Sequence, residues 1–337
     1  MMEPRDLFAR ALIRRTRPEA ERREHDLLSP AATRSTTSRG RNLPEAPDPF
    51  RTAFERDRDR ILHSKAFRRL KHKTQVFINP DGDHYVTRLT HTLQVTQIGR
   101  SLAVTLGLNE SLTEAICLGH DVGHSPFGHI GESALTPYVV GEWHHAAQSV
   151  RVFEVLEPLN LTWEVRDGIR GHSWKIDPPP ATPEGMVCRF ADRIAYLTHD
   201  VDDAVRAGVI QYRDLPGEAI DAFGEPGSAW IGSMIEAVAA ASVRRGEVTM
   251  DPGHLDAMNV LRDFMFARVY LRPDVDDQRD EVIAIVRYLV DHYVTHPDQV
   301  PDSYRHHGAD AATAAIDYVS GMTDRFAIRE HQRLTGS

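Results

Sequence analysis

The chain has 337 residues, of which 41% are hydrophobic and 26% are charged, and its formal net charge is −9. This composition is ordinary for a globular protein, and no apolar run reaches the roughly eighteen residues that a membrane span needs. The N-terminus lacks the apolar core of a signal peptide, and the two cysteines, Cys117 and Cys188, lie in apolar runs. We therefore expect a cytoplasmic protein with reduced thiols and no membrane partner.

Residues 1–50 are predicted to form a basic N-terminal arm that is partly irregular. Up to Lys73 the chain holds nineteen Lys or Arg residues against eleven Asp or Glu residues, whereas the remainder is acidic. The polar run at 33–41 and the prolines at 44, 47 and 49 oppose regular structure. A basic front end suits an anionic partner such as substrate phosphate, nucleic acid or a neighbouring subunit. A solvated arginine-rich arm is the alternative.

Residues 51–337 are predicted to form a helical domain with a C-terminal helical extension. The helical pattern begins near Phe54 and is interrupted by a turn at 79–83. Helices are then expected over residues 84–106, 111–121, 143–156, 163–170 and 184–206, with a rigid proline connector at 178–180. Further helices are expected over residues 231–243, 256–270, 276–295 and 309–334. Alternating strand patterns are nearly absent, so the predicted fold class is all-α.

Residues 118–132 concentrate ionisable side chains at an unusual density. Their sequence reads Leu-Gly-His-Asp-Val-Gly-His-Ser-Pro-Phe-Gly-His-Ile-Gly-Glu. Imidazole and carboxylate groups bind divalent metals, and a bound cation acidifies water into a nucleophile. The segment therefore predicts metal or proton-transfer chemistry, carried by His120, Asp121, His124, His129 and Glu132.

A histidine, a His-Asp pair and an aspartate on separate predicted helices complete a pattern written H…HD…D. Further motifs are the long His-Asp-x-Gly-His-x-Pro-Phe-Gly-His-x-Gly-Glu string and the stretches at 57–64, 66–77, 191–203 and 321–327. On these motifs the chain resembles the HD-domain phosphohydrolases, and most closely the deoxynucleoside triphosphate triphosphohydrolases. The resemblance runs from about Arg22 to the C-terminal end.

The resemblance implies an HD-domain helical bundle whose cofactor is a divalent metal ion. Two imidazoles and two carboxylates would balance the charge of the ion and leave positions for water and phosphate. Mn, Mg, Fe, Co and Ni all suit such a set. The ligands that the resemblance assigns are His91, His120, Asp121 and Asp192.

The resemblance also places catalytic residues after the His-Asp pair. His129 and Glu132 are three residues apart, so one helical turn would bring imidazole and carboxylate into contact. The family has essential residues at these positions and at His124 and His145, although a supporting role for the last two stays open. Which group protonates the 5′ oxygen is not readable, and His144 departs from the usual Glu-His-Asn of the family.

Substrate contacts are expected on the helix that carries Asp192. Tyr196 and Asp200 follow it at intervals of four residues, so the three share one helix face. By resemblance, Tyr196 closes the space beside the 2′ carbon of a deoxyribose and Asp200 holds the 3′ hydroxyl, which would exclude ribose.

Three further residues are assigned to substrate. Arg88 lies one turn before His91, and a guanidinium fork binds phosphate oxygens well. By resemblance, Arg193 contacts the triphosphate and Gln75 contacts the sugar.

The predicted function is metal-dependent hydrolysis of dNTPs, dGTP among them, at the α-phosphate to deoxynucleoside and inorganic triphosphate. One alternative is an HD phosphohydrolase acting on a monophosphate or a cyclic dinucleotide. Another is a nucleic-acid-binding protein with a regulatory HD site, because the basic arm could follow the backbone of single-stranded nucleic acid. The resemblance further implies a homo-oligomer, often a hexamer, and in some members a dNTP activator.

Overall fold

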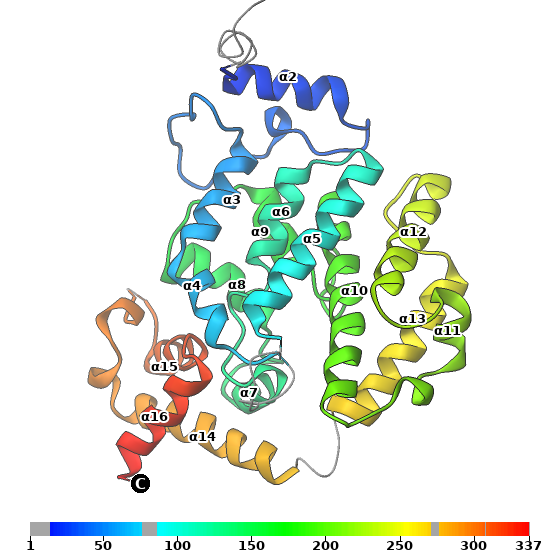
Figure 1. Ribbon diagram of the computed structural model, residues 1–337. Coiled ribbons are helices and arrows are strands. Elements are labelled where there is room, and N and C mark those ends of the chain that lie inside the picture. The colour runs from blue at the N-terminus through cyan, green and yellow to red at the C-terminus, as the bar shows by residue number, and fades with distance from the viewer. Residues whose placement is uncertain (1–13, 76–85, 271–275, 307, 337) are drawn as a thin grey trace, which may run out of the picture.

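The computed structural model describes residues 14–75, 86–270, 276–306 and 308–336, and helices dominate it (Figure 1). Within these residues no strand forms, and two isolated bridges join Arg41 to Thr162 and Thr74 to Thr87. The predicted all-α class is confirmed. The expected turn at 79–83 and the first residues of the helix expected from 84 lie outside the described residues.

The centre of the molecule is a bundle built around α5 (Arg88–Leu106). α6 (Glu110–Gly119) and α10 (Pro183–Arg206) pack along it, while α3 (Ala53–His63) and α9 (Trp163–Gly171) pack on α6. Thr87 caps α5 at its start, and the helix ends at Gly107. The φ of Gly107 is 65°, which glycine adopts without strain because it has no side chain. The helix expected over 184–206 is therefore present almost as predicted, and so is the described part of 84–106.

Helix α4 (Lys65–Arg69) packs on α3, helix α8 (His145–Arg151) packs on α9, and a π-helical turn (Val152–Leu156) extends α8. α11 (Gly217–Phe223), α12 (Ser228–Arg245) and α13 (Pro252–Met265) form a flank beside α10, and a second π-helical turn covers Phe266–Tyr270. The sequence did not predict α11.

A second apolar core lies under the C-terminal helices. α7 (Gly128–Leu135) and α14 (Asp276–Thr295) pack together, and α15 (Ala311–Ser320) and α16 (Asp324–Thr335) pack on α14. The single helix expected over 309–334 is wrong, because Gly321, Met322 and Thr323 separate two helices and Asp324 starts the second one.

The described part of the predicted arm lies against the bundle. It contains a helix that the sequence did not predict, α2 (Arg17–Leu27), which begins with a capping box between Thr16 and Glu19. Beyond it, Thr33 donates to Glu184 and Ser38 donates to Glu164, both buried carboxylates of the bundle. Hydrogen bonds to acidic groups thus anchor this polar segment.

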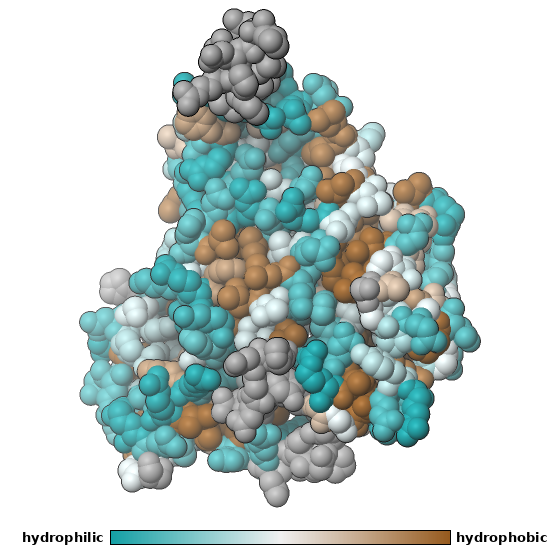
Figure 2. Space-filling view, in the orientation of Figure 1, coloured by the Kyte–Doolittle hydropathy of each residue, from teal (hydrophilic) through white to brown (hydrophobic). Residues whose placement is uncertain are grey.

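One face of the molecule shows apolar side chains near its middle (Figure 2). Helix α5 carries exposed Leu93 and Val104, and α12 carries exposed Val243. Exposed apolar groups of this kind are frequent at contacts between subunits. Self-association stays a prediction. No helix among the described residues is long and apolar enough to cross a membrane.

Candidate active site

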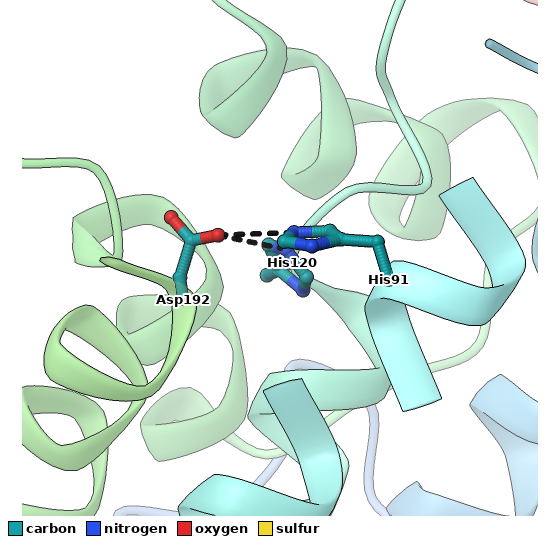
Figure 3. Close-up of side chains that lie close together, drawn as sticks. All are labelled: His91, His120 and Asp192. Atoms are coloured by element: carbon teal, nitrogen blue, oxygen red, sulfur yellow. Dashed lines mark hydrogen bonds and ion pairs between the residues drawn. The ribbon is translucent and has the colours of Figure 1, made fainter. Parts of the chain in front are cut away.

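Three predicted metal ligands meet where α5, α6 and α10 converge (Figure 3). His91 comes from α5, His120 follows the last residue of α6, and Asp192 lies on α10. His91 Nε2 stands 3.1 Å from Asp192 Oδ1, and His120 Nε2 stands 3.8 Å from the same oxygen. The ligating atoms of all three lie within 4.8 Å of one another.

This donor set fits a divalent cation. His120 Nδ1 lies 2.7 Å from the carbonyl oxygen of Cys117, which only accepts, so Nδ1 carries the ring proton. Nε2 of the neutral ring therefore offers a lone pair, and it is buried without a hydrogen-bond partner among the described residues. Burying a lone pair without a partner costs free energy, and a bound cation would provide that partner. Clustered imidazole and carboxylate groups accept several divalent metals.

Asp121 stands beside this cluster and is held by Arg88. Arg88 Nη1 donates to Asp121 Oδ2 at 2.6 Å, and both side chains are buried. The same Oδ2 lies 3.7 Å from His120 Nε2, while Oδ1 lies 3.8 Å from His145 Nε2. Burial opposes ionisation, but Arg88 and the histidines hold the pKa of Asp121 well below its usual range. Asp121 is therefore an anion facing two groups of imidazoles.

Glu132 connects two histidines on the other side of Asp121. His129 Nδ1 lies 2.6 Å from Oε2, and His145 Nδ1 lies 2.8 Å from Oε1. His124 stacks on His145 with ring centroids 4.6 Å apart. Burial opposes ionisation of Glu132, but His145 and His124 keep its pKa well below its usual range. The structure thus brings the four predicted catalytic residues into one group.

A single cavity of about 720 Å³ joins the two groups to the predicted substrate residues. Of the predicted site residues, only His120, which is fully buried, does not line it. The lining includes Gln75, Arg88, His91, Asp121, His124, His129, Glu132, His145, Asp192, Arg193, Tyr196 and Asp200.

One end of the cavity carries the predicted sugar contacts. Tyr270 donates from its hydroxyl to Asp200 Oδ2 at 2.7 Å, while Asp200 Oδ1 is buried without a partner among the described residues. Burial raises the pKa of Asp200 to about 7. The amide oxygen of Gln75 is likewise buried and unpaired. Desolvation raises the pKa of Tyr196 to about 12, so its phenol stays neutral. These groups are poised to meet polar atoms of a ligand.

Another part of the cavity wall is cationic. The Arg193 guanidinium lies 4.0 Å from the ring centre of Trp174 and donates to Asn259 Oδ1 at 3.0 Å. Lys175 and Arg262 also line the cavity. A stacked and hydrogen-bonded guanidinium is held in one orientation, which suits recognition of phosphate oxygens.

Comparisons with known proteins show which family the chain resembles. A family model described as the HD domain matches residues 88–197, and one described as the phosphohydrolase-associated domain matches residues 248–333. A deoxyguanosinetriphosphate triphosphohydrolase-like protein from Caldanaerobacter subterraneus subsp. tengcongensis is 45% identical over 95% of this chain and 96% of its own. Proteins of the same description from Desulfatibacillum aliphaticivorans (45%, over 94% and 97%) and Cereibacter sphaeroides (37%, over 92% and 100%) are also similar.

The chain belongs to the deoxyguanosinetriphosphate triphosphohydrolase-like family. A solved phosphohydrolase from Bacteroides thetaiotaomicron, 16% identical over 81% of this chain and 67% of its own, has a TM-score of 0.49 and adds nothing to the assignment. As a member of the family, the protein is a hydrolase with an HD phosphohydrolase domain.

One residue of this dGTPase-like site was missed in the sequence. His172 follows α9 and reaches the cavity, where its Nε2 lies 3.0 Å from His145 Nε2. Like His120, His172 directly follows the last residue of a helix, and both rings donate from Nδ1 to the carbonyl three residues earlier. Nothing in the sequence indicates that these two helix ends meet.

Proposed function

We propose that the protein hydrolyses 2′-deoxynucleoside 5′-triphosphates at the α-phosphate, releasing the deoxynucleoside and inorganic triphosphate. The observation that carries the proposal is the single cavity, which holds metal-binding donors, a His-Glu group, cationic side chains and the Tyr196–Asp200 pair. The names of the relatives point to dGTP as the first substrate to test.

The first step that the residues must support is binding. Arg193, held by Trp174 and Asn259, suits the outer phosphates, since its fork is already oriented. Asp200 Oδ1 and the Gln75 amide oxygen each lack a partner among the residues that the structure describes, and both can accept from sugar hydroxyls. Tyr196, one helical turn before Asp200 on α10, would pack against the 2′ carbon, where an added hydroxyl would have no room.

His91, His120 and Asp192 would hold the divalent ion, with Asp121 beside them. When bound, a divalent cation polarises phosphoryl oxygen and lowers the pKa of water. Arg88 holds Asp121 in place at 2.6 Å, so the carboxylate keeps its orientation while charge develops on the α-phosphate.

Hydrolysis breaks the bond between the 5′ oxygen and the α-phosphorus. The hydroxyl of water goes to phosphorus, and the leaving 5′ oxygen needs a proton. His129 is suited to give it, because Glu132 at 2.6 Å orients the ring. His145, on the other oxygen of Glu132, keeps that carboxylate in position.

The test is product analysis. The four dNTPs would be incubated singly and together with Mn²⁺ or Mg²⁺, and the products separated by ion-exchange chromatography. Deoxynucleoside with intact triphosphate is expected, and water labelled with ¹⁸O should leave its label in the triphosphate. Monophosphate with pyrophosphate, or diphosphate with phosphate, would refute cleavage at this bond.

A matched variant controls for contaminating phosphatases. His120→Ala removes a donor that faces the cluster, so turnover should be lost together with metal binding. Hydrolysis that persists in this variant would contradict the assignment of the ligands. Activity that appears only in dNTP mixtures would reveal an activator.

A further inference from the structure

A serine in the segment after α9 presents its hydroxyl group to the cavity. Ser173 lines the cavity together with Trp174 and Lys175. Its Oγ lies 3.3 Å from His144 Nε2 and 3.4 Å from the backbone nitrogen of Lys175. The directions of these two hydrogen bonds decide which part of the hydroxyl group remains free.

His144 can act only as a donor toward Ser173. Its Nδ1 lies 3.2 Å from the backbone nitrogen of Ala146, and because that N–H donates, Nδ1 carries no proton. Burial, together with neighbouring His145, lowers the pKa of His144 to about 4, so the neutral ring has its one proton on Nε2. His144 Nε2 therefore donates to Ser173 Oγ, as does the backbone N–H of Lys175.

The hydroxyl proton of Ser173 is the part that remains free. A serine hydroxyl has two lone pairs and one proton, and the two donors occupy both lone pairs. The proton has no acceptor among the residues that the structure describes. Because the half-buried side chain lines the cavity, the proton is available to a ligand there that offers an acceptor.

The surroundings of this hydroxyl favour an anionic acceptor. The next residue, Trp174, packs against the Arg193 guanidinium at 4.0 Å, and Lys175 lines the same wall. Lys175 pairs with Glu142 at 3.2 Å, but both side chains are exposed, and an exposed pair is weak enough for a phosphate to replace it. Two cations beside a hydroxyl donor suit the oxygens of a phosphate chain, which accept hydrogen bonds.

The backbone that carries Ser173 is held against α10. Trp174 Nε1 donates to the carbonyl of Arg189 at 3.0 Å, and Arg189 Nη2 donates to the carbonyl of Ser173 at 3.3 Å. The ring of Phe190 meets Trp174 edge-on, with centroids 5.2 Å apart. A donor that is already held in place loses little conformational freedom when it binds a ligand.

We propose that Ser173 binds the triphosphate of the substrate by donating its hydroxyl proton to a phosphate oxygen, and that His144 positions this hydroxyl. The proposal rests on the proposed function for the identity of the ligand. Ser173 contacts the substrate, whereas His144 acts through Ser173. Because the donor is neutral, it fixes the position of one oxygen and leaves the charge to Lys175 and Arg193.

Binding of inorganic tripolyphosphate tests this, because the probe presents a phosphate chain without sugar or base. Calorimetric titration of the full-length protein at one fixed Mg²⁺ concentration would compare the wild type with variants of Ser173. Ser173→Ala should bind about 10- to 100-fold more weakly, which is the usual effect of losing a hydrogen bond to a charged group. Ser173→Thr keeps a hydroxyl group and should restore binding.

Ser101→Ala is the matched control. It removes a hydroxyl group of α5 that donates to the carbonyl of Gln97 and does not line the cavity, so its affinity should equal that of the wild type. Binding of deoxyguanosine, which has no phosphate, should be the same in wild type and Ser173→Ala.

A double-mutant cycle tests the positioning role of His144. Asparagine can take over the cap of α8 that His144 provides, but it is too short to replace the donor to Ser173. His144→Asn should weaken tripolyphosphate binding when Ser173 is present and have no effect when residue 173 is alanine. A loss of equal size in both backgrounds would refute the positioning role.

Three results would overturn the role of Ser173. They are a wild type that does not bind tripolyphosphate, a folded Ser173→Ala protein with unchanged affinity, and an equal loss of affinity for deoxyguanosine. Ser173→Cys, which keeps the size and donates weakly, serves if the alanine variant does not fold. Binding needs no turnover, so unchanged affinity leaves dNTP hydrolysis standing, and failure of the product analysis leaves the binding measurement unaffected.

Discussion

Glu132 uses both of its carboxylate oxygens to orient histidines. Oε2 meets exposed His129, and Oε1 meets buried His145. We expect Glu132→Gln to lower kcat about 100- to 10,000-fold, which is the usual contribution of a positioned proton-transfer group. KM should change little, because the nucleoside and phosphate contacts are made by other residues.

Steady-state kinetics with dGTP across pH would measure this. Glu154→Gln, which alters an acid that pairs with Arg166 and does not line the cavity, is the control. A Glu132→Gln enzyme that loses affinity and keeps kcat would show that Glu132 binds substrate instead.

Asp200 should make stability depend on pH. Burial raises its pKa from 3.8 to about 7 in the folded protein, so the folded state binds this proton more tightly than the unfolded state does. Its stabilising contribution is complete below about pH 4 and is lost as pH rises through 7. At about 1.4 kcal/mol per pH unit, the loss is at most about 4 kcal/mol.

Chemical denaturation of wild type and Asp200→Asn at pH 5 and pH 8 would test this. The wild type should lose stability relative to the variant on going to pH 8. Parallel behaviour of the two proteins would show that Asp200 ionises normally.

At the scale of elements, the link between α15 and α16 holds the loop before α7. Asp324 accepts from the backbone N–H groups of Phe127 and Thr74, at 3.0 and 2.9 Å. Buried Lys73 donates to the carbonyls of His124 and Ser320. The motif at 321–327 therefore ties the C-terminal helices to the loop that carries His124, in which Phe127 has a φ of 61°.

Asp324→Asn should weaken this connection, because an amide has one acceptor oxygen and places N–H groups against a backbone donor. We expect a loss of about 1–3 kcal/mol in the free energy of unfolding, together with lower kcat. Urea unfolding and turnover would be compared with Asp298→Asn, an exposed aspartate near α14. Equal stability of the two variants would argue against the connection.

The elements that the sequence predicted well are those with an apolar periodicity. α5 and α10 each bury side chains at helical spacing, and Gly107 marks an end. α2 escaped prediction because none of its residues is buried, so no apolar stripe exists. The helix expected over 309–334 was wrong because Met322 and Ala327 continue an apolar pattern across the break, and helical periodicity cannot show that the chain turns there.

At the scale of the whole molecule, the arm closes over three buried acids of the bundle. Asp57 pairs with Arg41, Glu164 accepts from Ser38, and Glu184 accepts from Thr33. Removal of residues 1–50 would leave all three without these partners. Since an unpaired buried charge costs about 3–5 kcal/mol, the truncated protein should unfold at a much lower temperature or fail to fold.

Calorimetry of the full-length and truncated proteins would measure this effect. A truncated protein with an unchanged Tm would mean that the arm does not stabilise the helical domain, and that residues 51–337 fold independently of it.

The amino-acid sequence was sufficient to predict the helical class, the H…HD…D pattern and the residues of α10 that share a face with Asp192. These follow from local spacing, because helix periodicity sets which side chains point together. The packing of the helices was needed to show that the ends of α6 and α9 meet, that Asp121 stands between two groups of imidazoles, and that His172 faces His145. Such contacts join residues far apart in the chain, and local periodicity says which face of a helix is buried without saying what covers it.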